Sequence, residues 1–73
     1  MLTYEWLNRE KARFYKITII KDHPTNIKLN YQWGGCNSNR GGRKSIIVGS
    51  DEEVQTCISK MKSRRRQRGY EML

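Results

Sequence analysis

Seventy-three residues suffice for one domain, and they leave no room for an enclosed catalytic cavity with a supporting shell of side chains. Fifteen Lys and Arg against seven Asp and Glu give a net charge of +8, which favours a polyanionic partner: nucleic acid, an anionic membrane or an acidic protein. Apolar runs such as 17–20 are far shorter than the roughly 20 residues that cross a bilayer, and polar residues interrupt any leader-like segment. We therefore expect no membrane association and a cytoplasmic protein, nucleoid-associated if it is bacterial. A nuclear location stays open, because a short basic run also fits a nuclear localisation signal.

The first two thirds of the chain has the composition of β-strands. β-branched and aromatic residues alternate with polar ones, and turn-forming sequences separate the segments. We expect four strands, at residues 2–7, 14–22, 27–33 and 44–49. The third alternates strictly, so its apolar and aromatic side chains should share a buried face: Ile27, Leu29, Tyr31 and Trp33. A glycine-rich loop is expected over residues 31–44, between the third and fourth strands.

After Gly49 the apolar residues take the period of a helix. Ser50 and Glu53 have the spacing of an N-terminal capping box, and Gly69 suits the position that follows a helix C-terminus. One stripe of apolar residues is expected to face the sheet: Val54, Cys57, Ile58 and Met61. The sequence thus predicts a helix at about 51–68, with residues 70–73 available as an edge strand. The fold class is α+β: a single domain over 1–73, with an antiparallel sheet of four to five strands and one helix on one face.

Catalytic and cofactor chemistry find little support. His23 and two distant cysteines, Cys36 and Cys57, do not provide the four ligands of a zinc site, and we expect both thiols to be reduced. Residues 42–45 lead into a strand, whereas a phosphate-binding Walker loop opens a helix. We expect no enzyme, no cofactor or metal, and no small-molecule substrate.

Two groups of cations point instead to polyanion binding. The helix end carries more positive charge than its dipole requires, in Lys60, Lys62, Arg64, Arg65, Arg66 and Arg68. The glycine-rich loop adds Arg40, Arg43 and Lys44, with Trp33 at its mouth. Each feature also has a plainer interpretation: the charge run as a solvated face, the loop as a hairpin connection, and Trp33 as a core aromatic.

Three segments in order, RFYKITII, IKLNYQWGG and RGYEML, with an acid-started helix before the last, resemble the WGR domain across residues 4–73. The resemblance implies an antiparallel sheet with one packed helix and, as in the DNA-dependent poly(ADP-ribose) polymerases, binding to DNA at breaks. It implies that Trp33 packs on the sugar of a terminal nucleotide and that Tyr70 approaches the terminal phosphate, with Asn8 or Arg13 also within reach. Gly35 replaces the signature arginine, and Arg40 or Arg43 would substitute for it only if the loop folds back.

These observations predict a non-catalytic nucleic-acid-binding module that contacts DNA phosphates, with ends or nicks as candidate preferred targets. RNA stays open, because a basic patch and an aromatic residue do not separate it from DNA. The alternative is a protein-interaction adaptor whose basic patch meets an acidic partner. The candidate nucleic-acid-binding residues are Arg13, Trp33, Arg40, Arg43, Lys44, Lys62, Arg64, Arg65, Arg66, Arg68 and Tyr70.

Overall fold

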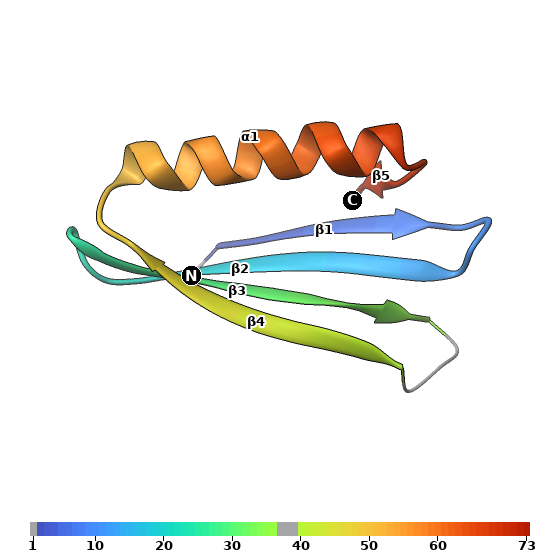
Figure 1. Cartoon of the computed structure of the whole chain (residues 1–73), viewed down its shortest axis with the longest axis horizontal. Coiled ribbons are helices and arrows are strands. Elements are labelled where there is room, and N and C mark those ends of the chain that lie inside the picture. The colour runs from blue at the N-terminus through green and yellow to red at the C-terminus, as the bar shows by residue number, and fades with distance from the viewer. Residues whose placement is uncertain (1, 37–39) are drawn as a thin grey trace.

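The computed structural model describes residues 2–36 and 40–73, which form one antiparallel sheet and one helix (Figure 1). The strand order is β4-β3-β2-β1-β5. The elements are β1 (Leu2–Asn8), β2 (Arg13–His23), β3 (Asn26–Gly35), β4 (Gly41–Val48), α1 (Asp51–Gln67) and β5 (Glu71–Met72). The expected α+β fold is confirmed, including the short edge strand at the C-terminus. No helix in the described residues has the length and apolar character that crossing a membrane would require.

The alternation of the strands separates a covered face from an open one. On β3, Ile27, Leu29 and Tyr31 are buried as predicted, and Ile17 of β2 joins them. Side chains from β1, β4 and the helix complete this core: Trp6, Val48, Val54 and Ile58. The residues between them on each strand project from the other face of the sheet, which no element in the described part of the chain covers.

The caps of α1 follow the sequence signals closely. The backbone N–H of Glu53 donates to the Ser50 hydroxyl at 3.2 Å, while the Glu53 carboxylate accepts from the N–H of Gly49 at 3.5 Å. The return half of the capping box thus falls one residue earlier than expected. At the other end Gly69 has a φ of +84°, and the N–H of Tyr70 donates to the carbonyl of Arg65 at 2.9 Å, which terminates the helix.

The glycine-rich loop is shorter than predicted. β3 continues through Gly35, and β4 begins at Gly41, three residues before the expected start. The prediction took glycines as loop formers, but several of them are strand residues where another group comes close. A Cβ on Gly42 would lie 2.6 Å from Cζ2 of Trp33, so glycine leaves space there for the indole ring. Residues 37–39 of the expected loop lie outside the described residues.

Both cysteines have free thiols, as predicted; Cys36 is exposed and Cys57 is half-buried against the core.

Candidate nucleic-acid interface

Three parts of the chain that are distant in sequence meet at one end of the molecule. They are the C-terminal end of α1, the turn between β1 and β2, and the adjoining ends of β3 and β4 (Figure 1). Between them lies a pocket of about 570 Å³, which we call the cationic pocket. Its lining residues are Lys11, Arg13, Phe14, Tyr15, Trp33, Gly34, Gly35, Arg40, Gly41, Arg65, Arg68 and Tyr70. Five of these described residues are cations and none is acidic, so the pocket favours an anion.

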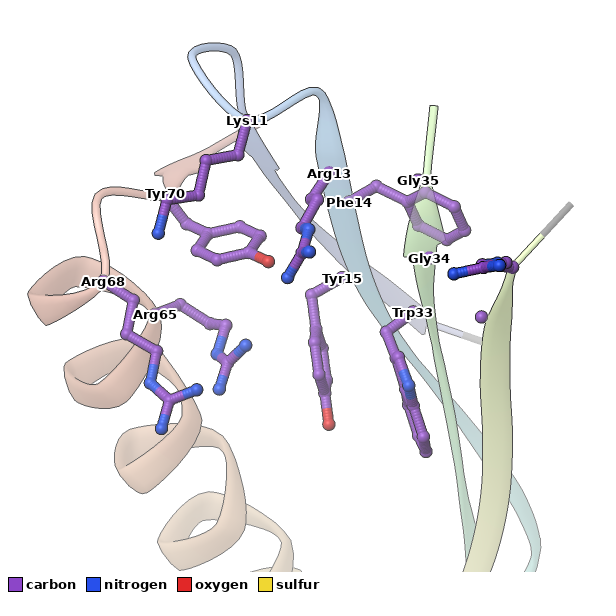
Figure 2. A pocket seen from close by; sticks show the side chains of 12 residues that line it. Lys11, Arg13, Phe14, Tyr15, Trp33, Gly34, Gly35, Arg65, Arg68 and Tyr70 are labelled. Carbon is purple, nitrogen blue, oxygen red and sulfur yellow. The ribbon is translucent and has the colours of Figure 1, made fainter. Parts of the chain in front are cut away.

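Aromatic rings form one wall of this pocket (Figure 2). The strand register aligns Trp6, Tyr15, Trp33 and Gly42 in one row across the sheet. The rings of Tyr15 and Trp33 stack, with centroids 5.8 Å apart and planes inclined by 15°. The indole therefore lies between Tyr15 and the bare backbone of Gly42, half-buried against the core while it lines the pocket. Trp33 is both a packing residue and a surface residue, which combines the two interpretations that its sequence position allowed.

Arg65 is the least expected member of the pocket. This residue is only 7% exposed, whereas an apolar stripe facing the sheet predicted that the basic residues of the helix would be left to solvent. That prediction was wrong because residue 65 continues the stripe of Val54, Ile58 and Met61, so this turn of α1 directs it toward the sheet. The same packing that orients the helix thus carries a positive charge inside the protein.

The guanidinium of Arg65 is held by rings rather than by carboxylates. Its Cζ lies 4.4 Å from the centre of the Tyr15 ring and 5.2 Å from that of Tyr70, both within the range of cation–π attraction. Its Nε is buried and has no hydrogen-bond partner in the described structure. A buried donor without an acceptor is costly, so this nitrogen lowers the stability of the fold.

Asn8 is a buried residue that links two of the elements around the pocket. It is 4% exposed; its amide nitrogen donates to the carbonyl of Arg68 at 3.1 Å, and its side-chain oxygen accepts from the N–H of Lys11 at 3.0 Å. These bonds join the end of α1 to the β1–β2 turn. Both polar atoms of the Asn8 side chain are therefore occupied within the fold, and of the two side chains that the family resemblance offered for a terminal phosphate, only Arg13 lines the pocket.

Burial raises the pKa of the Tyr15 hydroxyl above its usual value of 10.0, although nearby Arg65 and Arg64 act to lower it. Burial also raises the pKa of Tyr31 to about 12, with a smaller contribution in the same direction from Cys57. Both phenols therefore remain protonated at neutral pH. Tyr15 presents a neutral ring to Arg65, and the positive charge of the pocket is not cancelled by a phenolate.

The structure gathers six of the predicted binding residues in the cationic pocket and leaves five outside it. The six are Arg13, Trp33, Arg40, Arg65, Arg68 and Tyr70. Outside it, Lys44 lies over the ring of Tyr31 at 5.2 Å and Lys62 over that of Tyr4 at 5.4 Å. The other three are exposed: Arg43, Arg64 and Arg66.

Sequence reasoning missed two prominent lining residues, Tyr15 and Lys11. Tyr15 is a residue of β2, and the antiparallel register that pairs it with Trp33 is what brings it into the site. Lys11 belongs to a polar turn that gave no signal of its own.

No family model, curated protein or solved structure matches this chain. The resemblance to the WGR domain therefore rests on the motif residues alone.

Proposed function

We propose that this protein is a non-catalytic, WGR-like nucleic-acid-binding module that contacts DNA through its phosphates and accepts a strand terminus in the cationic pocket. The observation that carries the proposal is the guanidinium of Arg65, which lines the pocket among four further cations with no acidic neighbour in that lining. A guanidinium offers a fork of N–H donors that matches the oxygens of a phosphate.

The aromatic wall fits the same ligand. Trp33 and Tyr70 border the cations, so a sugar or base attached to the phosphate would meet a ring surface (Figure 2). Stacking of this kind contributes about 1–3 kcal/mol per base and tolerates any sequence. Because the pocket is walled by α1 on one side and the sheet on the other, a strand end can enter it more easily than the interior of a continuous duplex. This geometry favours ends and nicks.

Cations on the outer surface of α1 would extend the contact along the nucleic-acid backbone. Lys62, Arg64 and Arg66 are exposed and follow the helix toward the pocket. Each phosphate that such a side chain neutralises releases counterions, so the affinity should fall steeply as salt rises. The single helix of the described fold packs on the sheet, and we therefore propose no sequence-specific readout of the grooves.

Replacing one cation at the pocket tests the proposal against charge alone. Arg13→Gln removes a lining residue, whereas Arg9→Gln removes the same charge from an exposed side chain that does not line the pocket and only meets Glu71 at 3.5 Å. We expect Arg13→Gln to weaken binding to a short end-phosphorylated duplex about tenfold, the cost of one charge-assisted hydrogen bond, and Arg9→Gln by less than threefold. Equal losses for the two variants would reduce the interaction to net charge. Failure of the native protein to bind duplex at moderate salt would favour the adaptor alternative with an acidic protein partner.

A further inference from the structure

The face of the sheet opposite α1 carries a second group of cations. The neighbours of Lys16 and Lys28 in sequence are Ile17, Ile27 and Leu29, all fully buried under the helix, so the two lysines project from the other side. The register aligns Lys16 with Gln32 and with Arg43 across β2, β3 and β4. This open face was not among the sites that the sequence suggested.

The open face forms a shallow hollow of about 550 Å³, and its side chains suit the phosphate backbone of a nucleic acid. Three cations project into it, Lys16, Lys28 and Arg43, and none of the described lining residues is acidic. Lys44 borders the hollow, but its ammonium lies over the ring of Tyr31 on the covered face. Residues with hydroxyl and amide groups also line the hollow: Thr3, Thr18, Asn30, Gln32 and Ser45. The Ser45 hydroxyl donates to the Asn30 side-chain oxygen at 2.6 Å, which orients that amide and leaves its NH₂ group as a donor. Cations combined with hydroxyl and amide donors are the usual partners of phosphate oxygens.

The chemistry of the hollow differs from that of the cationic pocket. Its lining contains a single aromatic residue, Tyr31, whose side chain is buried on the covered face. A surface without accessible rings cannot stack bases, so the phosphates of an intact duplex fit it better than an unpaired strand. The carboxylate of Glu5 lies 3.7 Å from Lys16, which reduces the local charge and limits the affinity.

We propose that the open face is a second nucleic-acid-binding surface and that one molecule bridges two DNA segments. The cationic pocket opens between α1 and the sheet, whereas Lys16 and Lys28 project from the opposite face of the sheet. A straight duplex that reaches one surface leaves the other free, so the second occupant is a separate segment. The inference rests on the proposed function for its first segment and goes beyond it in assigning the second.

A two-duplex capture experiment tests the bridge. One duplex is fixed to beads, the protein is added at a concentration that saturates it, and capture of a second, labelled duplex is measured. Lys16→Gln with Lys28→Gln should leave binding of the first duplex within twofold and reduce capture of the second at least fivefold. The matched control, Lys60→Gln with Lys62→Gln, loses the same charge from the helix, and it should weaken the first binding while capture at saturation persists. Glu5→Gln should increase capture.

Three results would overturn the bridge. The native protein could bind one duplex without capturing a second. The open-face double variant could capture the second duplex as well as the native protein does. Bridging would then come from self-association of molecules that each bind one duplex. The open-face double variant could also lose binding of the first duplex as much as it loses capture of the second. The two faces would then act as one continuous surface. If the native protein binds no duplex in a direct titration, the proposed function fails together with the bridge, and that titration identifies the failure.

Discussion

Replacing Arg65 by methionine should separate a ligand-binding role from a structural one. Methionine keeps an unbranched apolar stem in the space beside Tyr15 and Tyr70, but it removes the charge and the buried Nε that has no partner. The substitution loses a cation–π attraction of about 0.5–2 kcal/mol. It also relieves an unsatisfied buried donor that costs about 1–3 kcal/mol. The two effects nearly cancel, so we expect the free energy of unfolding to stay within about 1 kcal/mol of the native value.

DNA binding should respond very differently to the same change. A hydrogen bond from a charged donor is worth about 1.5–3 kcal/mol, which corresponds to roughly a tenfold to hundredfold loss of affinity for an end-phosphorylated duplex. Arg64→Met is the matched control, because Arg64 is an exposed neighbour on the same helix and should lose less than threefold. Urea denaturation and fluorescence anisotropy at constant salt measure the two quantities. A large loss of stability with unchanged binding would refute the reasoning and make Arg65 a purely structural residue.

Further predictions concern the row of aromatic residues and the buried phenols. Gly42→Val should displace the indole of Trp33, since a Cβ at this position would lie 2.6 Å from Cζ2; we expect a loss of about 1–3 kcal/mol in urea denaturation and a shift in tryptophan emission, and an unchanged spectrum would contradict the packing. Stability should also fall at alkaline pH. Because burial raises the pKa of Tyr31 from 10.0 to about 12, the protonated phenol is favoured in the folded state; its contribution is complete below pH 10 and is lost as the pH rises to about 12. Tyr31→Phe should flatten that decline, and an equally steep decline in this variant would assign the effect to other groups.

The elements of the fold were predictable because their signals are local. Strict alternation identified Ile27, Leu29 and Tyr31 as a buried row, and helical spacing identified Val54 and Ile58. Both helix caps followed from side chains within a few residues of the helix ends. Such patterns depend only on the period of each element, which a sequence shows directly.

The arrangement of the site was not predictable in the same way. Which residue of β2 stands beside Trp33 depends on the strand register, and the sequence does not fix it. Arg65 was the nearest miss, because it continues the apolar stripe of the helix while its charge suggested exposure. Gly41 and Gly42 were assigned to a loop by their usual preference, which is overridden by the close approach of the Trp33 backbone to Gly41 and of the Trp33 ring to Gly42. In each case a contact between distant segments decided against the local tendency.

The most direct measurement is a competition between nicked and covalently closed circular DNA for the native protein already bound to a labelled, end-phosphorylated duplex, at near-physiological salt. It should be run beside Arg65→Met and Trp33→Ala, with circular dichroism to show that each variant is folded. If the cationic pocket receives a strand terminus, nicked circles will compete at least tenfold better than closed circles, and both variants will reduce that ratio toward one. Equal competition by the two circles, unchanged in the variants, would contradict the account and leave a protein that binds DNA through its surface charge alone.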